Sequence, residues 1–331
     1  MRLLCPKCKN EIILPDCGRC HYAVENINNI WQMTDKPNIN IDPDSENKYI
    51  GYDEIGEDFE PERIYHGDVN RFRVYDSCSK KVVDLYGKDV TVLDLGAGLG
   101  SASIPLADYG ANVIAVDISQ NMLEILHKRI RGKNLPNLIC CRMNAYELLI
   151  PDNSVDVVVE NAMLHLVDNP RAIINEIVRI LKPDGVIIRY GSPGLHGDSE
   201  KYSNNDLCNK ALSDIQNYYA TELKVKGYED MWFDNHFNEI ILEYFEKPYN
   251  EATDLIEEFT EKMKFRIHRL EHKAHSGYQH VPNTIHAVVW DKTDKYAKEK
   301  YGEKYREIPN YSKYTSCLDI YKKKTDISVS A

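Results

Sequence analysis

The sequence lacks the features of several protein classes. None of its apolar stretches approaches the roughly 18 to 20 residues that a bilayer crossing requires. Met1–Cys5 carries a charge and a Leu-Leu-Cys, but no apolar core of about 7 to 15 residues precedes the cysteine, so a secretion signal is not predicted. There is no internal repeat and no low-complexity tract. We therefore expect a cytoplasmic protein that does not enter a membrane.

Basic residues are in deficit: 41 Lys and Arg stand against 52 Asp and Glu, for a net charge of −11. This charge repels phosphate backbones unless a local basic patch overrides it, so nucleic acid is a disfavoured partner. The 43% of hydrophobic residues is ordinary for a folded soluble protein. At roughly 150 residues per domain, 331 residues predict about two domains that need no disulfide scaffold.

Apolar strand-like runs alternate with segments of helical period from residue 90 onward, which predicts βαβ units and a parallel sheet. The runs are Val90–Leu95, Asn112–Val116, Leu138–Cys141, Val155–Val159 and Val186–Arg189. Between them, Ser119 can cap a helix that stops at Gly132, and Asn169 followed by proline begins another. Lys182–Gly185 predicts a tight turn into the last of these strands.

The pattern loosens after Tyr190, and Leu195 to about Pro248 predicts a mostly helical insertion. We expect sheet pairing to resume near Phe265–Leu270 and again at Ser316–Tyr321. The aromatic residues of the insertion either line a pocket for a small molecule or form its own core. They are Tyr202, Tyr218, Tyr219, Tyr228, Trp232 and Phe233.

Four of the nine cysteines cluster in two CxxC pairs at the N-terminus, Cys5 with Cys8 and Cys17 with Cys20. Each pair can offer two thiolates from one tight turn, and four thiolates in tetrahedral array suit Zn²⁺. A closed site of four thiolates has no open coordination position, so the predicted role is structural. With the following Tyr22–Ile30, this spacing resembles the zinc ribbon of some bacterial methyltransferases and of the small Trm112-like proteins.

A glycine-rich loop, Gly96–Gly100, follows the first predicted strand and opens a helix, so that its backbone can approach a ligand closely. Asp117 follows the second strand, 21 residues after Gly96, where a carboxylate can accept hydrogen bonds from ribose hydroxyls. The third glycine comes one residue earlier than in the dinucleotide fingerprint, and Ser101 holds the expected place. Asp94 suits a cationic amino group better than a pyrophosphate, which favours an amino-acid-bearing nucleoside.

With these motifs, residues 47–190 resemble a class I S-adenosylmethionine-dependent methyltransferase. The resemblance covers the glycine loop, the run Val116–Leu123, the strand that leads to Glu160 with the following Asn161–His165, and the Lys182–Gly185 turn. It implies an α/β fold with a Rossmann-like, doubly wound, seven-stranded sheet. It also implies S-adenosyl-L-methionine as cofactor.

The resemblance also implies site residues. The glycine loop, Ala97 included, would line the methionyl and ribose parts, with Asp94 on the amino group and Asp117 on the ribose. Ile118 and Met122 would flank the adenine, although both also suit a helix core. The other implied cofactor-binding residues are Tyr52, with Tyr49 beside it, Gly96, Gly98, Gly100, Asn144, Ala145, Glu160 and Asn161. Asn144 stands where the family usually has aspartate, and its carbonyl oxygen can still accept from the adenine amine.

The resemblance identifies the methyl donor better than the acceptor. A general base could be His165 or His196, because imidazole titrates near neutrality, but a structural histidine is the favoured interpretation of each. We expect transfer to oxygen or nitrogen of a small molecule. The alternatives are a methyltransferase for a base of rRNA or tRNA, and a zinc-ribbon adapter with a vestigial nucleotide site.

The sequence thus predicts five segments. They are a zinc ribbon (1–36), an acidic linker (37–62), a cofactor-binding core (63–194), a helical lid (195–250) and a C-terminal completion of the sheet (251–331). The acceptor and the oligomeric state are not predicted.

Overall fold

The computed structural model describes residues 1–34, 71–191, 205–230, 233, 235–273 and 276–325. Several predicted features lie outside the described residues: the acidic linker, Tyr49, Tyr52, His196, Tyr202 and Trp232. No helix in the described part of the chain is both long enough and apolar enough to cross a membrane.

A nine-stranded sheet with the order β10-β11-β9-β8-β5-β6-β7-β4-β3 organises the described residues. Five strands from β5 to β9 are parallel to one another, and β11 enters antiparallel between β9 and β10. The strands are β3 (Asn26–Ile27), β4 (Ile30–Gln32), β5 (Thr91–Leu95), β6 (Asn112–Asp117), β7 (Leu138–Arg142), β8 (Val155–Glu160), β9 (Leu181–Gly191), β10 (Tyr249–Lys262) and β11 (Pro309–Lys322). The expected parallel sheet is confirmed, as is strand pairing at Ser316–Tyr321.

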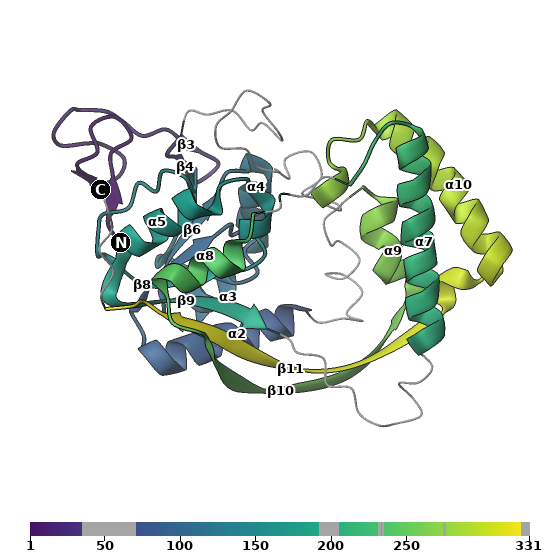
Figure 1. The fold of residues 1–331 in the computed structure, drawn as a ribbon. Helices are drawn as coiled ribbons and strands as arrows, with labels where there is room; N and C mark the ends of the chain where they lie inside the picture. Colours follow the sequence, from purple (N-terminus) through teal and green to yellow (C-terminus); the bar gives the residue numbers. More distant parts are fainter. Residues whose placement is uncertain (35–70, 192–204, 231–232, 234, 274–275, 326–331) are drawn as a thin grey trace.

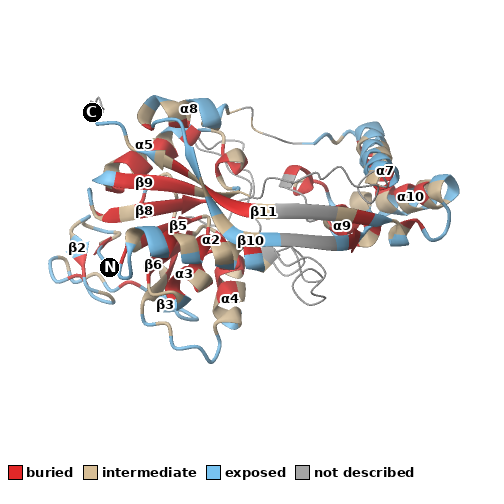
Figure 2. Ribbon diagram, turned by 90° about the horizontal axis from the view of Figure 1, so that it is seen from below, coloured by how far each residue is buried: buried red, intermediate tan, exposed pale blue. Residues whose placement is uncertain are grey.

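Helices cover both faces of the central strands, which are apolar on both sides for this reason. One face packs against α2 (Arg71–Tyr86) and α3 (Ser103–Asp108), and α4 (Gln120–Arg129) lies on the same side toward β7. The other face packs against α5 (Pro170–Ile180) and α8 (Phe237–Tyr244). Figure 2 shows the resulting burial of β8 and β9.

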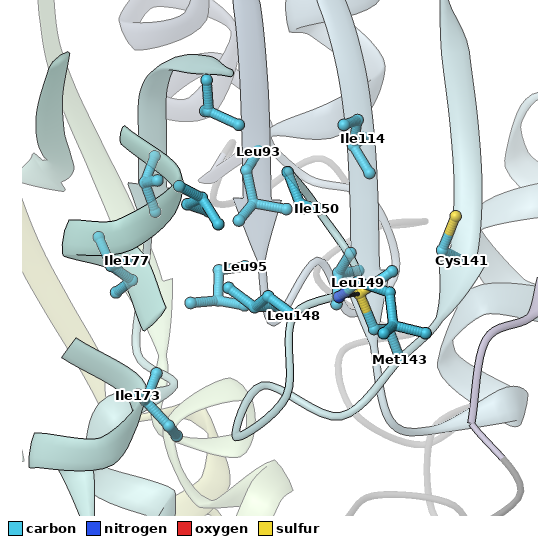
Figure 3. Close-up of a cluster of buried hydrophobic side chains, with 14 of the residues drawn as sticks. Leu93, Leu95, Ile114, Cys141, Met143, Leu148, Leu149, Ile150, Ile173 and Ile177 are labelled. Atoms are coloured by element: carbon cyan, nitrogen blue, oxygen red, sulfur yellow. Dashed lines mark hydrogen bonds between the residues drawn. The ribbon is translucent and has the colours of Figure 1, made fainter. Parts of the chain in front are cut away.

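The core beneath α5 brings strand, helix and loop side chains together. Leu93 and Leu95 of β5 and Ile173 and Ile177 of α5 are at most 1% exposed. The loop residues Leu148–Ile150 pack beside them (Figure 3). The two predicted helix caps are confirmed: Ser119 Oγ accepts from Met122 N, and Asn169 Oδ1 accepts from Ala172 N.

The N-terminal ribbon is joined to this sheet. It contains the two-stranded β1 (Leu3–Leu4) and β2 (Glu11–Ile12), and its β3–β4 hairpin extends the sheet beyond β7. The sheet therefore has two strands more than the predicted seven, because β4 pairs with β7 at an edge that would otherwise expose unpaired backbone groups.

A helical unit stands beside the sheet and is joined to it through the long strands β10 and β11 (Figure 1). It consists of α7 (Asn205–Val225), α9 (Met263–Glu271) and α10 (Asn283–Tyr301), which share one apolar core. The short helices η3 (Ser276–Tyr278) and η4 (Tyr305–Glu307) complete it. Residues from both sides of the predicted lid boundary at 250 therefore build this unit.

The prediction of a strand at Phe265–Leu270 is wrong, because these residues belong to α9. Phe265 and Ile267 alternate as in a strand, but Met263, Ile267 and Leu270 also have helical spacing, and all three lie in the core that α9 shares with α7. Both a strand period and a helical period fit this segment, and packing against α7 selects the helix.

The predicted Lys182–Gly185 turn coincides with an irregularity at the start of β9. The strand pairs with β8 at Val155↔Leu181 and next at Val157↔Val186, so the four residues 182–185 lie opposite the single residue Asp156.

Candidate active site at the carboxyl ends of the central strands

The glycine loop closes on the end of β6. The backbone N–H groups of Gly96 and Ala97 both donate to Val116 O at 2.9 Å. Gly96, Gly98 and Gly100 have φ angles of 74°, 53° and 78°, a region that favours glycine. The loop is therefore held at the point where the strand order reverses between β5 and β8, where open α/β sheets bind ligands.

The three glycines of the loop serve different purposes. A Cβ on Gly96 would lie 2.7 Å from Met163 Cβ, and one on Gly100 would lie 2.5 Å from Leu126 Cγ. A Cβ on Gly98 would meet no atom closer than 3.5 Å. Packing against the protein thus requires the outer two glycines, whereas a Cβ on Gly98 would make only an ordinary contact with Met122, so its positive φ is what favours glycine there.

Asp117 ties the loop to the start of α4. Its Oδ2 accepts from Gly98 N at 2.8 Å and its Oδ1 accepts from Ser119 N at 2.9 Å. The side chain is partly exposed, and each carboxylate oxygen can accept more than one hydrogen bond. Asp117 thus faces the glycine loop, as the sequence predicts.

Asp94 lies deeper, at 3% exposure, and accepts from Ser103 Oγ. Burial raises its pKa to about 6, the Ser103 hydrogen bonds oppose that rise, and the charge of Asp117 adds to it. Close to neutral pH the Asp94 carboxylate is ionised, and its burial makes the charged form unfavourable. A cationic group nearby would offset this loss of solvation.

The residues expected around a nucleobase occupy the turns after β6 and β7. Ile118 is half-buried, and Met122 is 6% exposed on α4. Asn144 Oδ1 accepts from Tyr146 N at 3.0 Å, and Ala145 is half-buried. The Asn144 oxygen keeps a second lone pair for a ligand donor.

Glu160 at the end of β8 is fully buried, and protein groups use both of its oxygens. Oε1 accepts from the N–H groups of Met163 and Leu164, and Oε2 accepts from Arg189 Nε at 2.7 Å. The carboxylate holds the loop after β8, in which Ala162 has a φ of 59° that is unusual for a residue with a side chain. Sequence reasoning missed Arg189, although a carboxylate in an apolar strand signals that a cationic partner is needed.

Asn161 is held next to Glu160. Its Oδ1 accepts from Tyr190 N at 2.8 Å, which fixes the orientation of the amide, and its Nδ2 is buried with no hydrogen-bond partner among the residues that the structure describes. An orphaned buried donor of this kind requires an explanation, and a bound ligand supplies one.

The other predicted candidates lie as follows. His165 is half-buried in the short helix η2 (Leu164–Leu166) after β8. Tyr219 is fully buried in the core of the helical unit and bonds His286 Nδ1 at 2.7 Å. Tyr218 stacks on Tyr296, with ring centroids 4.1 Å apart. These two aromatic residues thus pack within the helical unit.

The four N-terminal cysteines converge, with all their sulfur atoms within 4.8 Å of one another. Cys5 and Cys20 are 3.6 Å apart at sulfur, as are Cys8 and Cys17. A tetrahedral site with Zn–S bonds of about 2.3 Å requires sulfur separations of about 3.8 Å, so the set fits that ion.

The two cysteine pairs have matching backbones. Lys9 N donates to Cys5 O and His21 N donates to Cys17 O, each at 2.9 Å, and Lys9 and His21 both have positive φ. The backbone N–H of Asn10 lowers the pKa of Cys8 to about 6, whereas burial raises the pKa of Cys20 to about 12, so the convergence of the four sulfur atoms is the evidence for a metal site.

Comparison with known proteins agrees with this geometry. Residues 93–189 match the family described as "Methyltransferase domain". Demethylmenaquinone methyltransferase of Clavibacter sepedonicus is 38% identical over 104 residues, which cover 31% of this chain and 42% of that protein. Phosphoethanolamine N-methyltransferase 1 of Triticum aestivum is 35% identical over 119 residues, which cover 34% and 24%.

The chain spans less than half the length of these two relatives. Among solved structures, the YcgJ protein of Bacillus subtilis is 15% identical with a TM-score of 0.43, covering 74% of this chain and 98% of that one. By the family match, residues 93–189 are similar to a methyltransferase domain, which is the domain of an enzyme.

Proposed function

We propose that the whole chain is an S-adenosyl-L-methionine-dependent methyltransferase that transfers a methyl group to oxygen or nitrogen of a small molecule. One observation carries the proposal: Asp117, at the end of β6, bonds the glycine loop that follows β5 beside the switch point of the sheet, within the segment that matches the methyltransferase family. A carboxylate at the end of this strand is where a nucleoside's two ribose hydroxyls would donate.

The residues present fit an amino-acid-bearing nucleoside. Asp94 is a buried carboxylate that a cationic amino group would stabilise, and Asn161 Nδ2 is a buried donor with no hydrogen-bond partner among the described residues. The cofactor supplies a methyl group already activated on a positively charged sulfur.

We assign the remaining contacts on the same basis. Ile118 and Met122 flank the nucleobase, and Asn144 accepts from its amine beside Ala145. Glu160 positions the loop after β8 rather than reaching the cofactor with its occupied oxygens. Tyr52 remains a proposed cover for the cofactor.

The protein's own contribution to transfer is alignment and exclusion of water, because the leaving group needs no activation. His165 follows β8 and His196 follows β9, so either is a candidate base where the acceptor must lose a proton.

A small-molecule acceptor is supported by the net charge of −11, which disfavours a polyanion. It is also supported by the names of the two relatives, which give demethylmenaquinone and phosphoethanolamine as their substrates. We assign no individual acceptor.

The Cys5, Cys8, Cys17 and Cys20 cluster is proposed as a structural Zn²⁺ site. Four sulfur ligands leave no open position for a substrate, so the ion would stabilise the ribbon and take no part in methyl transfer.

Transfer of labelled methyl from S-adenosylmethionine into fractionated cell extract tests this function. We expect label in the small-molecule fraction when the purified chain is added, and none when Asp117→Ala is added. Label confined to RNA would replace the small-molecule acceptor with a nucleic-acid base, and the absence of label in every fraction would contradict the proposal.

A further inference from the structure

The β3–β4 hairpin joins the cysteine ribbon to the methyltransferase domain. β4 runs parallel to β7, with Gln32 opposite Arg142, and Arg142 in turn is opposite Asp117 of β6. These three residues form one row across the ends of three parallel strands. The ribbon therefore reaches the same sheet edge as the proposed ribose-binding carboxylate.

Arg142 links the hairpin to the turn that follows Asp117. Its Nε donates to Ile118 O at 3.1 Å, and its Nη1 lies 3.5 Å from Gln32 Oε1. Gln32 Nε2 donates to Gln120 Oε1 at 2.9 Å. Arg142 thus holds the carbonyl of Ile118, before the Ser119 cap, and Gln32 holds the side chain of Gln120, after it.

This turn carries the proposed nucleoside contacts. Met143 N donates to Asp117 O at 3.0 Å, so β7 fixes the backbone on one side of the turn, and Arg142 fixes it at Ile118. A rotation of the Ile118 peptide would move both the carboxylate of Asp117 and the apolar side chain beside it.

The hairpin also holds α4 farther from the site. Asn28 Nδ2 donates to Glu124 Oε1 at 3.1 Å, and Asn29 Nδ2 lies 3.0 Å from His127 Nε2. Together with Gln120, these helix residues have the spacing of one face. The Asn29–His127 contact does not touch the Asp117 turn, so His127→Ala, which removes this contact from the helix side and leaves the hairpin turn intact, provides a matched control.

The cysteine cluster connects to the hairpin through a shared core. Leu3, Cys5, Ile12 and Cys17 are buried in the same cluster as Leu148–Ile150 of the methyltransferase domain. A ribbon of this size has too little core of its own to keep its conformation without a cross-link. Loss of the metal would therefore loosen β4.

We propose that Arg142 and Gln32 are positioning residues for the nucleoside end of the site, and that the metal-bound ribbon thereby sets the affinity for the cofactor. This inference rests on the proposed function and adds a role for the ribbon in that same site. The ribbon would then contribute directly to cofactor binding.

The first test measures the dissociation constant of S-adenosylhomocysteine by calorimetry on full-length variants. We expect Arg142→Met to weaken binding about 10-fold and Gln32→Leu about 3-fold, because a charged and a neutral hydrogen bond to the turn are lost. Arg142→Lys should recover part of the loss, since its ammonium group can still reach a carbonyl. His127→Ala should leave the affinity unchanged.

Hydrogen exchange of the ligand-free protein gives a readout independent of binding. Ser119 N and Met122 N both donate within the turn and the helix cap, so Arg142→Met should speed their exchange, and His127→Ala should not. Unchanged exchange in Arg142→Met, or equal losses of thermal stability in all variants with unchanged affinity, would overturn the positioning role.

Removal of the metal from the full chain by a chelator is the second test. We expect the affinity for S-adenosylhomocysteine to fall as far as in Arg142→Met, and metal removal from that variant to add little, because both changes act through one link. Equal affinity with and without metal would overturn the role of the ribbon. Absence of binding to the metal-loaded wild type would instead refute the proposed function, and the exchange experiment would still decide whether Arg142 holds the turn.

Discussion

Asp117 holds a position that serves both the fold and the proposed ligand. It satisfies the N–H groups of Gly98 and Ser119 and stays partly exposed at the end of β6, next to the glycine loop. A carboxylate with two protein donors is already oriented before a ligand arrives, which lowers the entropic cost of binding.

Asp117→Ala removes both ribose acceptors. We expect the dissociation constant of S-adenosylhomocysteine to rise by about two orders of magnitude, as two hydrogen bonds to a charged group are lost. Calorimetry is the measurement, and Asp108→Ala is the control because Asp108 pairs with Lys133 at the surface. A change of less than threefold in Asp117→Ala would remove this residue from the ligand site.

Asp94 makes stability depend on pH. Its folded pKa of about 6 lies above the usual 3.8, so the folded state holds the proton between about pH 4 and pH 6, and the free energy of unfolding falls as pH rises through this window. Asp94→Asn resembles the protonated form and should not show this fall.

We expect the variant's advantage in unfolding free energy to grow to about 3 kcal/mol above pH 6, as a difference of about two pKa units implies. Urea unfolding at pH 4 and pH 7 measures it. Cofactor affinity should fall in the same variant if Asp94 faces the amino group. Parallel pH profiles for the two proteins would mean that Asp94 is not buried as described.

Single residues also mark the limit of what the sequence could predict. The order and spacing of the motifs predicted where Asp117 and the glycine loop lie, because these motifs are close together in the sequence. The partners of Glu160 could not be foretold, since Arg189 lies 29 residues away and their contact depends on how β8 and β9 pair. Asn161 was predicted as a site residue, but nothing in the sequence indicated that its Oδ1 would accept from Tyr190 N or that its Nδ2 would have no partner among the described residues.

At the scale of elements, the glycine loop packs against the loop after β8. Gly96→Ala adds a Cβ 2.7 Å from Met163 at a φ of 74°, whereas Gly132→Ala adds one at a φ of 87° with no atom within 4 Å. We expect about 3 kcal/mol of destabilisation for the first and about 1 kcal/mol for the second, because both strain the backbone and only the first also overpacks. Chemical denaturation gives both values, and equal losses would show that the loop contact is not tight.

The sequence predicted elements well where the period was unambiguous. The Ser119 and Asn169 caps and the five parallel strands follow from local chemistry. The period of Phe265–Leu270 fits both a strand and a helix, and only the core shared with α7 selects the helix. The pairing of β4 with β7 joins residues more than 100 positions apart and has no local signal.

At the scale of the whole molecule, three parts depend on one sheet. The ribbon extends it at β7, and β10 and β11 carry the helical unit beyond its other side (Figure 1). The buried face of the ribbon belongs to the same core as β5 and α5, so damage to the ribbon should be felt in the stability of the domain.

Cys8→Ser tests this connection. Cys8 is only half-buried, so the substitution removes a metal ligand with little loss of packing. We expect metal content to fall from about one zinc ion per chain and the thermal midpoint to drop by roughly 5 to 10 °C, as several kcal/mol of metal-linked folding energy are lost. Buried Cys140→Ser is the comparison, with a stability loss but full metal content. Metal content unchanged in Cys8→Ser would contradict a four-cysteine site.

The most direct test of the central claim is a calorimetric titration of the metal-loaded chain with S-adenosylhomocysteine and, separately, with NADH. The account predicts one molecule of S-adenosylhomocysteine bound per chain in the micromolar range and no heat from NADH. Binding of NADH alone, or heat from neither compound, would contradict it.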